Sequence, residues 1–379
     1  MRASQPVRIP SLPRVPAARR RSARGFTLVE LMVALVIGTL IALAAGALAI
    51  SFDASRKTLV ASNNANGSGA GAAASLSAQV AMAGAGLVTH GQQTCQTLYF
   101  SGPGSPLAID PLNIVHAGAA ASDVVQFAFA SGGSTDASLP LTAPLTALNA
   151  PLTLSAVGAV TTRAQVLLAN AQQACLLRNA TSVLAGTGNA AGTSTLQFDP
   201  TDPLNGANIG AALPTFDTTS TLVPAGTLQV QQWYAQDGFL MRRDLLSAAS
   251  ASNPSKMADG VLFLRAQYGI DLGSGIAWSD VPAAAPALSV AQLQGLRSIR
   301  IALLARTSER ERQTNPAACV TTTNPLQSLG NGWGLTVDVS ALTTSTGAAL
   351  VPDWKCYSYR GFTVVQPLRN VIWGVQVPA

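Results

Sequence analysis

The sequence predicts an α+β protein in which a long N-terminal helix precedes a β-rich globular head. Three observations indicate this class. A charge-free apolar segment lies near the N-terminus, and short apolar runs separated by turn residues follow from about residue 98 onward. The chain also has 33 glycines and 22 prolines, too many for a long helical rod. With 48% hydrophobic and 11% charged residues, the chain is too apolar for a disordered protein. Its 379 residues allow one large domain or two of ordinary size.

The first 25 residues account for the basic character of the chain. They carry seven of the 23 basic side chains, no acidic one, and four prolines that disfavour a helix. The other 16 basic side chains are matched by 17 acidic ones, so the remainder has a net charge of −1. A nucleic-acid-binding domain needs a basic face on its folded body. The sequence therefore predicts a basic leader over residues 1–25 and does not support a nucleic-acid partner.

An apolar segment that is long enough to cross a membrane follows the leader. Residues 31–52 are 22 residues without a charge, and as a helix they span roughly 33 Å against a hydrocarbon core of about 30 Å. The arginines before this segment favour a cytoplasmic N-terminus. We therefore expect a single transmembrane helix over residues 26–52 in the inner membrane, with the head in the periplasm. Glu30 stands out, because a carboxylate in a membrane helix costs about 2.5–3.5 kcal/mol and normally implies a partner.

Residues 24–33, with the sequence RGFTLVELMV, resemble the class III signal of type IV prepilins and pseudopilins. This resemblance implies that a prepilin peptidase cleaves between Gly25 and Phe26 and methylates the new N-terminus of Phe26. It also implies an assembly role for Glu30. The cationic amine of Phe26, in the same or a neighbouring subunit, would neutralise this carboxylate where apolar helices stack. The alternative is an uncleaved membrane anchor in which Glu30 occurs by chance.

The helix is expected to continue into the periplasm over residues 53–88. Its apolar positions form a sparse stripe of Leu59, Val60, Leu76, Val80 and Leu87. Residues 63–71 (NNANGSGAG) interrupt this stripe. Because glycine costs about 1 kcal/mol in a helix interior, the interruption predicts a kink or a melted turn.

The head, residues 89–379, is expected to be built mainly from strands. The apolar runs that predict strands lie at residues 124–129, 165–168, 228–234, 239–245 and 296–305. The third and fourth of these runs are joined through Asp237-Gly238, which is a hairpin signal.

Other parts of the head give weaker signals. Residues 261–268 predict a strand or a short helix, and residues 289–296 predict a helix. Residues 131–160 and 185–225 are rich in Ala, Thr, Gly and Pro, and we expect long loops or weakly ordered insertions there.

Four widely spaced cysteines predict disulfides: Cys95, Cys175, Cys319 and Cys356. No C-x-x-C pair occurs, which disfavours a zinc site or a thioredoxin-like redox site. An even count in an exported domain favours disulfides, for which three connectivities are open. Loop-closure entropy favours the local pairs Cys95–Cys175 and Cys319–Cys356. Free thiols are the alternative.

The sequence offers no catalytic constellation. It contains neither a G-x-S-x-G nor an H-E-x-x-H motif. His90 and His116 lie in turn-like surroundings without a nearby ligand set, so we expect them on surface loops. We predict that the protein is not an enzyme and that it has no catalytic residue, cofactor or metal. A membrane-anchored periplasmic enzyme is the alternative from another class, and the missing motifs disfavour it.

Four segments of the body resemble, in this order, the PilW group of minor pilins. They are Met82-Ala83-Gly84, residues 267–271 (QYGID), residues 299–306 (IRIALLAR) and residues 359–370 (YRGFTVVQPLRN). Relatives often carry an acid-rich loop after the second segment. Here the sequence LGSG follows, with Asp280 as the next acid, so a metal is not expected in that loop.

The two resemblances imply a minor pilin of the type IV pilus, a low-copy subunit that primes assembly or caps the tip. It would thereby support twitching motility, adhesion or DNA uptake. The implied partners are the prepilin peptidase, the major pilin and other minor pilins through the N-terminal helix, and a tip adhesin. The protein would move from the inner membrane to the pilus at the cell surface. The alternative is a pseudopilin of the type II secretion system, of the J type found at the tip.

Overall fold

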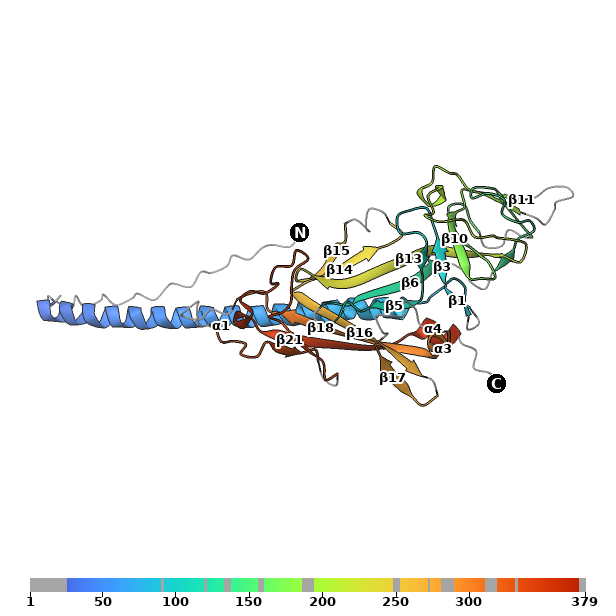
Figure 1. Ribbon diagram of the computed structural model, residues 1–379. Helices are drawn as coiled ribbons and strands as arrows, with labels where there is room; N and C mark the ends of the chain where they lie inside the picture. Colours follow the sequence, from blue (N-terminus) through green and yellow to red (C-terminus); the bar gives the residue numbers. More distant parts are fainter. Residues whose placement is uncertain are drawn as a thin grey trace, which may run out of the picture. The chain divides into compact units, whose positions relative to one another are not determined.

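The computed structural model describes residues 26–374, apart from the following segments: 90–91, 119–120, 133–137, 156–159, 186–193, 248–252, 272, 281–289, 311–318 and 331–332. In the described part, one long helix, α1 (Leu28–Met82), precedes a β-rich head (Figure 1). The predicted α+β class is therefore confirmed. The chain divides into two compact units, residues 1–56 and residues 57–379, and α1 is continuous across the boundary.

Helix α1 runs without a break through the glycine-rich segment, so the kink or melted turn predicted at residues 63–71 is wrong. Tertiary packing explains why the helix persists there. The ring of Phe362 occupies the space that a Cβ at Gly69 would need. Small residues let the head approach the backbone closely, and this contact offsets the intrinsic cost of glycine in a helix. The buried positions recur every three or four residues, as one face of a helix requires: Ala61, Ala65, Gly69, Ala72, Leu76 and Val80.

The helix expected over residues 53–88 ends earlier, at Met82, and the apolar stripe predicted for it is only partly correct. Leu76, Val80 and Leu87 are fully buried, whereas Leu59 and Val60 are exposed. Four of the six buried positions are small residues, three alanines and a glycine, and hydrophobicity alone does not distinguish them from the small residues on the exposed side of the helix.

Residues from the C-terminal end of the chain cap the end of α1. Asn370 Nδ2 donates hydrogen bonds to the carbonyls of Ala81 (2.9 Å) and Ala83 (3.2 Å). Gly84 adopts a positive φ of 77°, which glycine tolerates best at a helix end, and its N–H donates to the Ala128 carbonyl at 2.9 Å. Asn370 lies in the short helix α4 (Arg369–Gly374).

The larger sheet contains ten described strands, seven of which follow the path β15-β14-β13-β9-β10-β3-β4. Strands β6 and β7 also pair with β13, and β5 pairs with β6. The strands are β3 (Thr97–Tyr99), β4 (Leu107–Ala108), β5 (Leu112–Val115), β6 (Val124–Gly132), β7 (Leu139–Pro140), β9 (Gln165–Ala169), β10 (Ala174–Asn179), β13 (Thr221–Gln236), β14 (Phe239–Asp244) and β15 (Ser255–Asp259).

The hairpin predicted through Asp237-Gly238 is confirmed. Gln236 of β13 pairs with Phe239 of β14, which leaves a two-residue turn. Both turn residues have positive φ, 52° for Asp237 and 81° for Gly238, as the turns that match the twist of a hairpin require.

A second, antiparallel sheet has the strand order β17-β16-β18-β21. Its strands are β16 (Val261–Asp271), β17 (Ile276–Ser279), β18 (Leu296–Arg306) and β21 (Tyr359–Pro367). Residues 261–268 are therefore strand rather than helix. The helix predicted before β18 is present as α3 (Val290–Gly295). Three of the four family-like segments lie on neighbouring strands of this sheet.

The main hydrophobic core joins α1 to both sheets. It contains Leu76 and Val80 of α1, Phe127 and Trp233 of the larger sheet, and Ile301 of the smaller one. Figure 1 shows the C-terminal part of α1 lying along the strands of the head. The opposite face of the smaller sheet packs against residues 329–351 in a separate cluster. The central strands β16 and β18 are thus buried on both faces, whereas β17 and β21 keep exposed residues.

Residues 139–222 contribute a further hydrophobic cluster. A three-stranded sheet forms there from β8 (Leu152–Leu154), β12 (Ser194–Gln197) and β11 (Ser182–Ala185), followed by the 3₁₀ turn η2 (Pro203–Asn205). The prediction of long loops or weakly ordered insertions at 131–160 and 185–225 is therefore wrong for these strands. Alternate apolar residues such as Leu152 and Leu154 are buried, so the strands have a core of their own.

Short elements complete the described chain. They are the pair β1 (Val88–Thr89) and β2 (Gln92–Gln93), the pair β19 (Leu326–Ser328) and β20 (Thr336–Asp338), and the 3₁₀ turn η4 (Trp354–Cys356).

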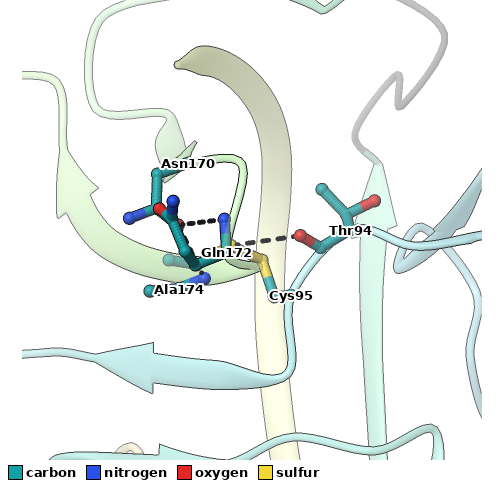
Figure 2. The surroundings of a disulfide bond; sticks show 6 residues. Thr94, Cys95, Asn170, Gln172 and Ala174 are labelled. Atoms are coloured by element: carbon teal, nitrogen blue, oxygen red, sulfur yellow. Dashed lines mark hydrogen bonds between the residues drawn. A yellow bond between two sulfur atoms is a disulfide. The ribbon is translucent and has the colours of Figure 1, made fainter. Parts of the chain in front are cut away.

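Two disulfides staple the head, Cys95–Cys175 and Cys319–Cys356. These are the pairs that loop closure favours. Figure 2 shows Cys95 beside the turn between β9 and β10. In that turn Asn170 Oδ1 accepts hydrogen bonds from the N–H groups of Gln172 (3.1 Å) and Ala174 (3.0 Å). The Cys95–Cys175 disulfide therefore ties the start of β10, directly after this turn, to the segment that leads into β3.

Replacing both Cys319 and Cys356 by alanine is expected to lower the free energy of unfolding of the oxidised protein by about 3–4 kcal/mol. The bond closes a loop across a sequence separation of 37, and opening it gives the unfolded chain more freedom. Denaturant unfolding measures the loss, and non-reducing peptide mapping checks the pairing. Free thiols at both positions in protein recovered from an oxidising compartment would contradict this prediction.

Candidate functional site

The candidate site is the start of α1. Phe26 and Thr27 precede the first helical residue, Leu28, and Phe26 is 81% exposed. Gly25, the other half of the predicted cleavage junction, lies outside the described residues. The exposed aromatic residue and the helix that follows are the features from which this site is built.

Thr27 and Glu30 form a capping box, which the sequence analysis missed. The backbone N–H and the hydroxyl of Thr27 donate to Glu30 Oε2 at 3.2 and 3.1 Å, and the Glu30 N–H donates to Thr27 Oγ1 at 3.3 Å. The signal was present, because Thr-x-x-Glu ahead of an apolar run is the usual sequence signature of this cap. The side chain of Glu30 is therefore held at the N-terminal end of α1, within its first turn. Within the described residues it has no ion-pair partner.

The first half of α1 has an exposed apolar surface all round. Every residue from 28 to 53 is exposed, and the large apolar side chains among them include Leu31, Leu40 and Phe52. By length and composition α1 can cross a membrane, with a mean hydropathy of 2.6 in its most apolar window. Apolar area on this scale is unfavourable in water, so this segment requires lipid or other apolar helices around it.

His116 lies in the loop after β5, as a surface or loop histidine would, but its side chain is only 9% exposed, so it is not a surface residue. Its Nδ1 lies 3.0 Å from Asp123 Oδ2, and its Nε2 lies 3.9 Å from Asp280 Oδ1. Asp123 is fully buried, and it also accepts from Arg265 Nη1 (3.1 Å) and from the Ala266 N–H (2.9 Å). A buried carboxylate needs such partners, so this cluster ties the 116–123 segment to β16. His90 lies outside the described residues.

The loop after β16, in which no metal is expected, is held by the side chain of Asp271. Asp271 Oδ1 accepts from the N–H groups of Gly273 (2.9 Å) and Gly275 (3.2 Å). Across the described segments, no three His, Cys, Asp or Glu side chains are arranged to hold a metal.

Two family models match the chain. The model described as the prokaryotic N-terminal methylation motif matches residues 20–46, which include Gly25, Phe26 and Glu30. The model described as type IV pilus-assembly protein W matches residues 227–370, from within β13 into α4. No curated protein and no solved structure matches the chain.

Proposed function

We propose that this chain, a PilW-like pilin related to the type IV pilus, is a minor subunit that primes pilus assembly or caps the pilus tip. The observation that carries the proposal is the exposed apolar helix that begins at the methylation motif and continues without interruption into the core of the head. PilW and pilin families are structural rather than enzymatic. In this proposal the head makes contacts and performs no chemistry.

The physical argument starts from the two halves of α1. The half from Leu28 to Phe52 is apolar on every side, which suits lipid before assembly and a bundle of similar helices after it. The half from Ala61 to Val80 is buried on one face by the head. One continuous helix, α1, joins the apolar half to the half that the head buries. Insertion of the apolar half therefore incorporates the head.

The proposed organisation follows from this division. Residues 1–25 form the leader that the prepilin peptidase removes, and residues 26–52 anchor the mature chain in the inner membrane. Residues 53–88 lead into the periplasm, with the helix continuing as far as Met82, and residues 89–379 form the head. The head would contact other minor pilins or a tip adhesin. The match to a pilus-assembly model favours the pilus over the type II secretion system. Support for twitching motility, adhesion or DNA uptake would be a consequence of assembly.

A Gly25→Val variant, expressed as the only copy in its host, tests processing and function together. The peptidase must approach the backbone closely at this glycine, so we expect an uncut precursor that stays in the membrane. We expect few or no sheared pili and unchanged type II secretion. Intact mass measures cleavage, and immunoblots of sheared surface and culture fractions measure the other two quantities.

The matched control is Gly38→Val, which makes the same change within the span. No heavy atom lies within 4 Å of the Cβ position there, so this variant should be cleaved and should support pili. A wild-type chain that begins near residue 50 would contradict the prepilin interpretation. Lost secretion with normal pili would favour the pseudopilin instead.

A further inference from the structure

Arg300, a partly exposed residue of β18, lies against two tryptophan rings. Its guanidinium carbon is 4.7 Å from the ring centroid of Trp278 and 4.3 Å from that of Trp333. Both distances are within the range of cation–π contacts. Trp278 comes from β17, and Trp333 comes from the segment between β19 and β20. Two distant parts of the chain thus place an aromatic ring against one cation.

A glycine on the intervening strand β16 makes room for one of these rings. Gly269 pairs with Trp278. A Cβ at Gly269 would lie 2.9 Å from Cζ3 of the Trp278 ring, closer than real side chains approach. Because glycine has no side chain, the indole can lie over the backbone of β16 and reach Arg300 on the next strand.

Hydrogen bonds hold the guanidinium of Arg300 by one end. Its Nε donates to Gln267 Oε1 at 2.6 Å, and Gln267 Nε2 donates to Asp280 Oδ1 at 2.7 Å. Gln267 is only 8% exposed, so this bridge has little freedom to move. The guanidinium is therefore held in place, and its remaining donors are those of Nη1 and Nη2.

The other end of the guanidinium is free and accessible. Among the described residues, Nη1 and Nη2 of Arg300 have no hydrogen-bond or ion-pair partner. In Arg178 the nitrogens without a hydrogen-bond partner are buried, whereas in Arg300 none of them is. Burial lowers the pKa of the Arg300 guanidinium, and the charge of Asp280 only partly offsets this effect. The N–H groups at the open end form a fork that matches the two oxygens of a carboxylate.

Exposed aliphatic side chains flank this site. Val365 of β21 pairs directly with Arg300 and is 57% exposed. Ile276 of β17 is 51% exposed and, like Trp278, lies beside Gly269. Arginine and tryptophan among apolar residues are typical of the centre of a protein–protein interface. The guanidinium already covers one face of each indole, which removes that face as a stacking surface for a sugar. These features favour a carboxylate on a protein.

We propose that Arg300, with Trp278 and Trp333 around it, binds the carboxylate of an aspartate or glutamate on a partner protein. Apolar residues on either side of that acid would contact Ile276 and Val365. The identity of the partner as another pilus subunit rests on the proposed function. Carboxylate binding itself does not, and it can be measured on this chain alone.

Fluorine NMR of the full mature chain in detergent, labelled with 5-fluorotryptophan, tests the proposal. The chain has five tryptophans, and Trp278→Phe and Trp333→Phe assign the two signals of interest. The probe is a pool of pentapeptides, capped at both ends, with Glu in the centre and Leu, Val, Ala or Thr at the other positions. We expect saturable shifts of these two signals and no shift of the signal of Trp233, which is buried in the core. A pool with Gln in place of Glu should bind at least about tenfold more weakly, because it lacks the charge.

Three variants assign the binding to the fork of Arg300. Arg300→Met removes the fork and should abolish the shifts. Arg306→Met changes an arginine of the same strand that lies over one ring, that of Tyr357 (4.6 Å), and should leave the shifts unchanged. Arg300→Lys keeps a charge without the planar fork, so it should weaken binding, and it decides the question if Arg300→Met does not fold.

Three outcomes would overturn the proposal. The first is the absence of shifts with the Glu pool, and the second is equal binding of the Glu and Gln pools. The third is an undiminished response in either Arg300 variant. Free glucuronate is the comparison ligand for an acidic sugar. If glucuronate shifts the signals of Trp278 and Trp333 at lower concentrations than the Glu pool does, the site belongs to a sugar acid and not to a protein partner.

Discussion

Glu30→Gln is expected to leave export and cleavage intact and to reduce the share of the protein found in sheared pili by at least about tenfold. Glutamine can still complete the capping box with Thr27, because Gln serves at this position as Glu does. What it loses is the charge. If the carboxylate neutralises the amine of Phe26 in a bundle of helices, the change leaves a cation unpaired in a dry environment, which costs about 3–5 kcal/mol.

Companion variants separate the charge from the cap. Thr27→Ala breaks the capping box and keeps the carboxylate, so it should lose about 1 kcal/mol of helix stability and enter pili nearly as well as the wild type. Glu30→Ala removes both and should resemble Glu30→Gln. Glu30→Asp keeps the charge on a shorter side chain and should be intermediate.

The measurement is the ratio of sheared to membrane-bound protein for each variant, with cleavage checked by intact mass. A Glu30→Gln chain that enters pili at the wild-type ratio would show that charge pairing is not needed for this subunit. A defect in Thr27→Ala as large as that in Glu30→Gln would assign the effect to the cap. A subunit that lies at the extreme tip has no neighbour above it, which makes its own carboxylate less important than that of a shaft subunit.

The N-terminal region could be predicted well because its physics is local. Twenty-two charge-free residues indicate a membrane helix from their own composition, whatever surrounds them. The hairpin at Asp237-Gly238 could likewise be predicted from adjacent residues, because a turn with two positive φ values favours those residue types. Strands with strong local patterns, such as β6 and β18, fall in the same group.

The wrong predictions concern parts of the fold whose structure depends on residues that are distant in the sequence. The low exposure of the His116 side chain depends on its contact with Asp123, which Arg265 contacts from 142 residues further along the chain. The three-stranded sheet β8-β12-β11 depends on β8, which pairs with β12 some 40 residues further along the chain. The sequences of the four family-like segments did not predict that these segments pack together. In the structure, Ala83, Tyr268, Ile301 and Leu368 from these segments share one hydrophobic cluster.

Gly69 illustrates this dependence, and Gly69→Ala is expected to lower the free energy of unfolding by about 1–3 kcal/mol. Alanine is normally the better helix residue. At Gly69, however, a Cβ would overlap the ring of Phe362 on β21, so either the ring or the helix must move. That movement would disturb the packing of Phe362 in the head against α1.

Two neighbouring glycines provide the matched controls for Gly69→Ala. Gly67 and Gly71 are exposed, and no heavy atom lies within 4 Å of their Cβ positions. Gly67→Ala and Gly71→Ala should therefore stabilise the protein by about 0.5–1 kcal/mol, through helix propensity alone. Denaturant unfolding of the mature chain in detergent, followed by the fluorescence of its tryptophans, gives all three values.

The opposite signs are what make this test informative. A kinked or melted segment would gain from alanine at every glycine, because each substitution would favour the helix. A continuous helix packed against Phe362 gains at Gly67 and Gly71 and loses at Gly69. A Phe362→Leu background should reduce the Gly69→Ala loss by at least about 0.5 kcal/mol, since the smaller side chain leaves room for the methyl group. Stabilisation by all three substitutions would mean that the head does not hold α1 at this turn.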